Sequence, residues 1–123
     1  MCIRDRVWVP GWASGDIASF NEKTEEWKVY KLPHGVNAMP YALSVHPKTG
    51  EVWVNGTGSD TMIRFNPKTE TFTEYRMPTR VTYTREVEFD QDGDVWVCNS
   101  NYPTRHIENR HGSVIQVQIG DKS

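Results

Sequence analysis

The most constraining feature of this 123-residue chain is a sequence segment that is repeated after 45 positions. The segment NEKTEEWKVYKLP at 21–33 is matched by NPKTETFTEYRMP at 66–78, and the same shift places Trp8 on Trp53 without a gap. A third copy of the tryptophan, Trp96, follows Trp53 by 43 residues. Repeats of this length with short strands are typical of β-propellers, in which each repeat forms one blade.

Each repeat contains short segments of alternating polarity separated by turn residues, which indicates antiparallel hairpins. No window has the apolar spacing of an amphipathic helix, so we expect an all-β fold. Because four strands make a blade, the sequence predicts a fragment of a β-propeller with about two and a half four-stranded antiparallel blades. The expected strands are 7–9, 16–20 and 27–31, then 41–46, 51–55, 61–65 and 71–76, and finally 84–89, 94–98 and 113–119.

The domain organisation follows from this repeat. We expect blades at about 7–33, 34–78 and 79–119 within a partial propeller over 7–123, and we interpret residues 1–6 as a non-native N-terminal extension. A propeller needs roughly four to eight blades to close its ring, so the remaining blades are expected on a longer chain. The isolated chain should aggregate or associate, because outer blade faces are expected to expose Trp8, Ile17 and Phe20.

Composition excludes several classes of partner. The net charge of −2 leaves no electrostatic footprint for nucleic acid. The chain has no run of about 18 apolar residues, so no transmembrane helix is expected and no membrane partner is predicted. With residues 1–6 set aside, Cys98 is the only cysteine and no internal disulfide can form.

Four segments carry a resemblance to a known family: PYALSV at 40–45, GEVWV at 50–54, MIRFNP at 62–67 and FTEYRMP at 72–78. This pattern resembles the blades of the virginiamycin B lyase (streptogramin lyase) family over about residues 7–119. The resemblance implies a carbon–oxygen lyase of antibiotic resistance, which opens the ester of a cyclic depsipeptide by elimination. It also implies Mg²⁺ and a histidine general base at the channel mouth. Secreted propellers contain the same blade pattern, so a periplasmic or secreted location is favoured over a cytoplasmic one.

The family's catalytic positions are occupied by other residue types in this chain. The catalytic histidine of the family stands after a proline at the start of an innermost strand, where this chain has Tyr41 and Arg85. The metal-site glutamates of the family follow the blade tryptophan, where this chain has Asn55 and Cys98. The catalytic residues are therefore unknown. Either the active site lies on blades outside this sequence, or proteins of this kind perform other chemistry.

Topology indicates which end of the propeller is functional. The connections 35–39, 55–60, 79–83 and 98–112 should share one rim, whereas the turns 47–50, 66–69 and 91–93 should share the other. Trp53 to Phe65 spans 12 residues but Trp96 to its counterpart Val117 spans 21, so the third blade carries about nine extra residues on the first rim. Such loops usually carry function. We expect a small-molecule or peptide-like ligand at this loop-rich rim.

Two groups of side chains are candidates for binding there. The inserted loop offers metal or anion ligands in Asn99, Asn101, His106, Glu108 and His111, although a solvated polar loop is the alternative reading.

At the channel mouth the candidates are Tyr41, Arg85 and Glu86, because the innermost strand lines the channel. The alternatives are an ion pair between blades for Arg85 and Glu86, and a packing role for Tyr41. His34 and His46 are expected at the surface.

Two other features are interpreted as structural. The segment Asp90–Asp94 resembles a calcium loop but lies at a hairpin, so a turn is expected. The repeated tryptophans should fill the wedge between neighbouring blades.

Three functions remain open at this stage. They are a lyase with part of its catalytic residues elsewhere, a non-catalytic propeller that binds a ligand or a protein, and a gluconolactonase-like lactone hydrolase that uses a divalent metal.

Overall fold

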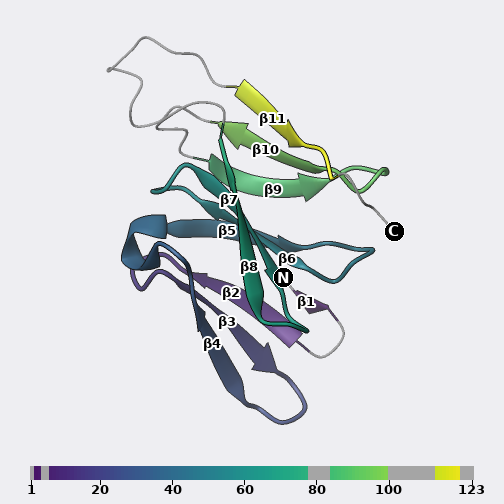
Figure 1. The fold of residues 1–123 in the computed structure, drawn as a ribbon. Coiled ribbons are helices and arrows are strands. Elements are labelled where there is room, and N and C mark those ends of the chain that lie inside the picture. The colour runs from purple at the N-terminus through teal and green to yellow at the C-terminus, as the bar shows by residue number, and fades with distance from the viewer. Residues whose placement is uncertain (1, 4–5, 78–83, 100–112, 120–123) are drawn as a thin grey trace.

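The computed structural model describes residues 2–3, 6–77, 84–99 and 113–119. Within these residues the chain forms three antiparallel sheets that stack one after another in chain order (Figure 1). The only helical element described is the single 3₁₀ turn η1 (Gly35–Ala38). No helix in the described part is long and apolar enough to cross a membrane. The predicted all-β architecture of propeller blades is confirmed.

The first two sheets have four strands each, in chain order. The first sheet contains β1 (Cys2–Ile3), β2 (Arg6–Gly11), β3 (Asp16–Asn21) and β4 (Trp27–Lys31). The second contains β5 (Pro40–Val45), β6 (Val52–Gly56), β7 (Thr61–Asn66) and β8 (Thr71–Arg76). The strand β1 uses residues that were expected to lie outside the fold. The blade ranges and the non-native character of residues 1–6 stay predictions.

The third sheet contains β9 (Thr84–Phe89), β10 (Val95–Asn99) and β11 (Ser113–Val117), with β10 in the middle. Val117 is paired with Val95, as Phe65 is paired with Val52 in the second sheet. Val117 is therefore the counterpart of Phe65, as the sequence predicted. The extra residues of this repeat fall between β10 and β11.

The core lies between the sheets. Trp8 is 5% exposed and its ring contacts Tyr30 and Phe65, with centroid distances of 6.0 and 5.8 Å. Trp53 is fully buried in a second cluster with Val87 and Val95 of the third sheet. The predicted wedge role of these two tryptophans is confirmed, since each lies where one sheet meets the next.

The prediction that Trp8, Ile17 and Phe20 are exposed is wrong in part. Trp8 and Ile17 are buried against the second sheet, and Phe20 is half-buried. Successive residues of a strand point to opposite faces. The outward face of the first sheet therefore carries the other set of residues, including Trp27 at 61% and Val29 at 58% exposure.

The described connections between strands lie on the two rims that the topology predicted. On one rim Gly58 N donates to Ala38 O at 3.0 Å, which joins the β6–β7 turn to η1. On the other rim Lys48 Nζ donates to Gln91 O at 3.0 Å, which joins the β5–β6 and β9–β10 turns. In Figure 1 η1 lies at the left edge and the second group of turns at the right.

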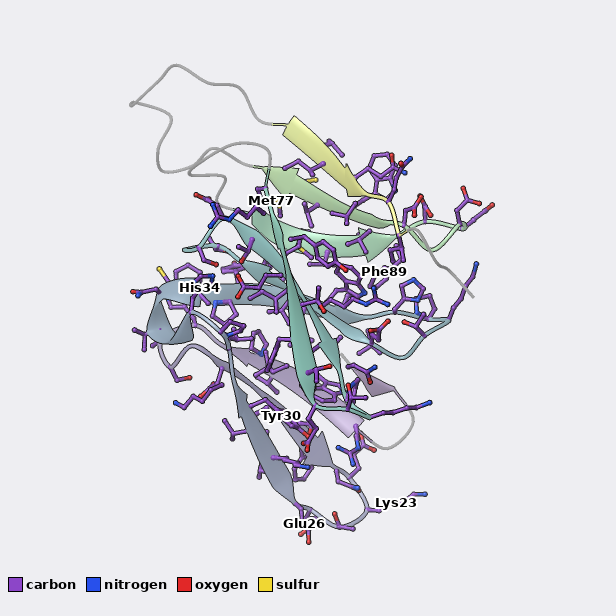
Figure 2. All side chains as sticks on the ribbon, viewed as in Figure 1. Lys23, Glu26, Tyr30, His34, Met77 and Phe89 are labelled. Atoms are coloured by element: carbon purple, nitrogen blue, oxygen red, sulfur yellow. The ribbon has the colours of Figure 1, made fainter. Side chains whose placement is uncertain are left out.

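His46 is buried, so its expected surface position is wrong. Its Nδ1 accepts hydrogen bonds from Lys48 N at 3.1 Å and Thr49 N at 3.2 Å, and its Nε2 lies 2.8 Å from Gly93 O. Because Nδ1 accepts, the proton is on Nε2, which donates to Gly93 O. The ring also packs on Phe89, with centroids 4.8 Å apart (Figure 2). His46 therefore caps its own turn and ties the second sheet to the third.

The acidic turn at Asp90–Asp94 has the predicted hairpin geometry. Asp90 Oδ1 accepts from Asp92 N at 2.9 Å and from Asp94 N at 3.0 Å. Asp90 Oδ2 accepts from the Trp96 indole N–H at 2.7 Å. The indole bond is the largest cause that lowers the pKa of Asp90 below its ordinary value. The carboxylate thus serves as a turn cap, as His46 does in the preceding repeat.

We predict that His46→Ala lowers the free energy of unfolding by about 2–4 kcal/mol, because buried polar partners are left unsatisfied and a cavity opens. The control is His34→Ala. His34 Nε2 lies 2.7 Å from Glu74 Oε2 in an exposed pair, which should contribute less than about 1 kcal/mol. Urea denaturation measures both variants. Equal losses would contradict the role of His46 as a link between sheets.

Candidate functional site

The candidate site is the loop-rich rim, which is built on η1 and the turns on either side of it. Gly15 has φ +71°, and a Cβ there would lie 2.0 Å from Gly35 O. A Cβ on Gly58 would lie 2.5 Å from Asn37 O. Only glycine at positions 15 and 58 allows such close approach of the backbone. The described rim is therefore a closely packed platform.

Tyr41 is placed at this rim by a β-bulge. The register between β5 and β6 shifts between Pro40 and Leu43, so Tyr41 and Ala42 lie in the irregular segment. Bulges next to functional sites re-aim side chains. Tyr41 is 46% exposed and its ring meets the ring of Trp12 edge to face, with centroids 5.7 Å apart. An aromatic pair from two different blades therefore sits on the rim.

Asn55 holds this bulge from beneath. Its side chain is fully buried, and Oδ1 accepts from Tyr41 N at 3.0 Å and from Ala42 N at 2.9 Å. These two amides lie where the β5–β6 ladder is interrupted, so the side-chain oxygen replaces the missing backbone acceptor. Nδ2 of Asn55 is buried without a hydrogen-bond partner in the described structure. Asn55 stands where the family resemblance leads one to expect a glutamate.

The third sheet repeats the irregularity. The register between β9 and β10 shifts between Val97 and Asn99, and Arg85 lies in the irregular part of β9. The side chains of Arg85 and Asn99 lie outside the described part of the structure. Glu86 is exposed, whereas the next residue, Val87, is buried against the second sheet. The structure thus brings the two inner strands β5 and β9 side by side with matching bulges.

Several expected site residues are not described. Asn101, His106, Glu108 and His111 lie in 100–112, outside the described residues. Within the residues that are described, no three His, Cys, Asp or Glu side chains gather closely enough to hold a metal ion.

Both described histidines lie away from the channel mouth. His34 precedes η1 and pairs with Glu74 on β8, the outermost strand of the second sheet (Figure 2). His46 is buried at the opposite rim beside Gly93. Neither ring is placed to act as a base beside Tyr41.

Two contributors to the site were not predicted. Trp12 has no tryptophan at the matching position of the second repeat, which is Thr57. Asn55 lies in β6, two residues after Trp53, and the signal that could have identified it is a polar residue directly after the apolar run Val52–Val54. A buried amide at the end of a strand has to bond to backbone groups that lack other partners.

Comparisons with known proteins give the fold. No family model and no curated protein matches the chain. Among solved structures, a streptogramin B lyase aligns with a TM-score of 0.73 and 19% identity, over 95% of this chain and 38% of its own. The virginiamycin B lyase of Staphylococcus aureus aligns with a TM-score of 0.72 and 19% identity, over 95% and 39%.

A catalytically inactive variant of the Staphylococcus aureus enzyme with quinupristin aligns with a TM-score of 0.68 and 18% identity, over 95% and 39%. The chain therefore has the propeller fold of virginiamycin B lyase and spans less than two fifths of the length of these structures. The fold expected from the resemblance is confirmed.

We predict that Asn55→Ala lowers the free energy of unfolding by about 2–4 kcal/mol, because two part-buried N–H groups lose their acceptor and the buried side chain leaves a cavity. The matched control is Asn66→Ala. Asn66 Oδ1 also accepts two backbone N–H bonds, from Lys68 and Thr69, but in a turn exposed to water, which can replace the lost oxygen. The control should lose less than about 1 kcal/mol. Thermal and urea denaturation measure both, and a similar loss in each would show that burial of Asn55 is unimportant.

Proposed function

We propose that this chain supplies part of the ligand-binding mouth of a propeller that opens a cyclic depsipeptide by carbon–oxygen elimination. The observation that carries the proposal is the aromatic pair of Trp12 and Tyr41 on a rim braced by Asn55. The likeness in fold to virginiamycin B lyase over 95% of the chain supports it. Apolar rings of a peptide-like ligand would pack on the exposed face of Tyr41.

The proposed reaction needs a base but no water. The base takes a proton from the carbon next to the one that bears the ester oxygen. The electrons of the broken C–H bond form a carbon–carbon double bond, and the ester oxygen leaves as part of a carboxylate. His106 and His111 are the proposed sources of the base, since the described histidines lie elsewhere.

The other candidate residues have binding roles in this proposal. Asn99, Asn101 and Glu108 would hold polar groups of the ligand, and Arg85 would hold the carboxylate that forms. Magnesium, which the resemblance leads one to expect, is given no step in this proposal.

A non-catalytic ligand-binding propeller is the second candidate function. The observation that favours it is that His46 lies on the opposite rim and that His34, at the start of η1, pairs with Glu74 on the outermost strand β8. In that case the rim binds the ligand and leaves it intact. A lactone hydrolase, the third reading, would add water to its substrate.

The experiment is to incubate the complete propeller that contains this chain with quinupristin and to follow quinupristin by liquid chromatography and mass spectrometry. Elimination opens the ring without changing the mass, so we predict a new chromatographic peak of unchanged mass. Hydrolysis of the ester would add the mass of one water. Bound but unchanged quinupristin would support the non-catalytic reading, and no binding would contradict both.

Variants separate binding from chemistry. The His106→Ala, His111→Ala double variant should lose turnover and retain binding. Tyr41→Ala should weaken binding about five-fold, which corresponds to about 1 kcal/mol for an aromatic contact. Val36→Ala is the control, because Val36 is 60% exposed on the same rim but has no ring. Turnover that survives in the double variant would remove the loop histidines from the mechanism.

A further inference from the structure

Met39 has a backbone conformation that the local sequence disfavours. It ends η1 with φ 46° and ψ 62°, in the left-handed region that residues other than glycine rarely adopt. The next residue is Pro40, and a residue before proline favours extended backbone. Two local preferences therefore oppose this conformation, so the surrounding fold has to enforce it. Backbone strain of this kind clusters at ligand sites, where it fixes a geometry before the ligand arrives.

Hairpin turns account for the other described residues of this kind. Glu25 and Glu70, with φ 60° and 57°, occupy the same position of two repeated turns. Asp60, with φ 55°, occupies the repeat position of Gly15, with φ 71°. Tight hairpin turns require left-handed residues at such positions. Met39 instead joins η1 to β5 (Figure 1), and a left-handed residue at a helix end is usually glycine or asparagine.

The fold clamps the chain on both sides of Met39. Before it, Ala38 is fully buried and its carbonyl oxygen accepts from Gly58 N at 3.0 Å. After it, Asn55 Oδ1 accepts from Tyr41 N at 3.0 Å. The Met39 side chain itself lies against the β6–β7 turn, where a Cβ on Gly58 would come within 2.7 Å of its Sδ. The strand β6 and the turn after it therefore set the path of the chain from η1 into β5.

Tyr41 is the side chain that this path directs. It is the second residue after Met39, and its ring meets the ring of Trp12 with centroids 5.7 Å apart and planes at 84°. Because Trp12 and Tyr41 come from different sheets, their contact depends on where β5 begins and in which direction it runs. A rotation of the backbone at Met39 would move the start of β5 and the Tyr41 ring with it.

We propose that Met39 is a positioning residue for ligand binding: its left-handed backbone, held by β6 and the following turn, fixes the Tyr41 ring against Trp12 before a ligand arrives. This inference rests on the proposed function, in which rings of a peptide-like ligand pack on Tyr41. A ring fixed in advance binds more tightly, because less conformational freedom is lost on binding. Met39 does not touch the ligand and acts through Tyr41.

The test is Met39→Gly in the complete propeller that contains this chain, with quinupristin as the probe. Glycine adopts a φ of 46° without strain, but it also adopts many other conformations. Titration calorimetry should therefore show about threefold weaker binding, since a smaller fraction of the protein holds the competent geometry. The melting temperature should change by less than about 2 °C, because relief of strain and greater freedom of the unfolded chain oppose each other.

Two further variants are controls. Glu25→Gly makes the same kind of change at a residue with φ 60° that is exposed in the β3–β4 turn, on the opposite rim, and should leave binding unchanged. Met39→Asn is the conservative variant, because asparagine takes the left-handed conformation more readily than other residues with a side chain. It should bind quinupristin more tightly than Met39→Gly does.

A double-variant cycle separates an action through Tyr41 from a general structural role. When Tyr41→Ala is already present, Met39→Gly should weaken binding no further, because the ring that it positions is gone. A general structural role would instead give the same loss of affinity in both backgrounds.

The possible failures are distinguishable. A parent propeller that does not bind quinupristin, or binding that Tyr41→Ala leaves unchanged, would remove the proposed role of Tyr41 and this inference together. Binding that Tyr41→Ala weakens and Met39→Gly does not would overturn this inference alone. Equal losses from Met39→Gly in the two backgrounds, or a loss of stability without a loss of affinity, would also overturn it.

Discussion

The packing of one tryptophan per repeat against the next sheet is the interaction on which the rest of the structure depends. A single antiparallel blade has two faces and can bury neither alone. Trp8 and Trp53 lie at equivalent places and each closes one junction between sheets. Their large apolar rings fill the wedge that opens between twisted sheets, and on the turn rim hydrogen bonds from His46 and Lys48 join the second sheet to the third.

The rims differ because their links differ. On the turn rim, His46 and Lys48 reach across to the backbone of the next repeat. On the loop-rich rim the hydrogen bonds from Leu32 N to Gly15 O and from Gly58 N to Ala38 O, both at 3.0 Å, stay within one repeat each, and the close backbone approach of Gly15 to Gly35 joins the two repeats. A rim joined by backbone leaves side chains such as Tyr41 available to a ligand. This is the physical basis for placing function there.

The repeat made most of the fold predictable. A period of 43–45 residues with turn signals at fixed offsets defines where strands begin and end, and the described strands other than β1 agree with the expected ranges to within about two residues. Which face of the first sheet is buried was predicted wrongly. Alternation gives two sets of residues, and only the position of the neighbouring sheet decides that Trp8 and Ile17 form the inner set.

The site was less predictable because its contacts join distant positions. Tyr41 meets Trp12 from another blade, and no local pattern around a single tyrosine reports such a partner. Tyr41 was identified from its place after a proline at the start of an inner strand, but the bulge that aims it depends on Asn55 from the next strand. The inserted loop stays a prediction from composition, since its residues lie outside the described part.

The most direct test of the central claim compares two tryptophans at equivalent repeat positions, one covered by the next sheet and one that no described sheet covers. Trp53→Ala and Trp96→Ala would be measured by urea denaturation. The account predicts a loss of about 3–5 kcal/mol for Trp53, which the third sheet covers, and about 1 kcal/mol for Trp96. Equal losses at the two positions would contradict it, because the tryptophan would then stabilise its own sheet and not the junction with the next.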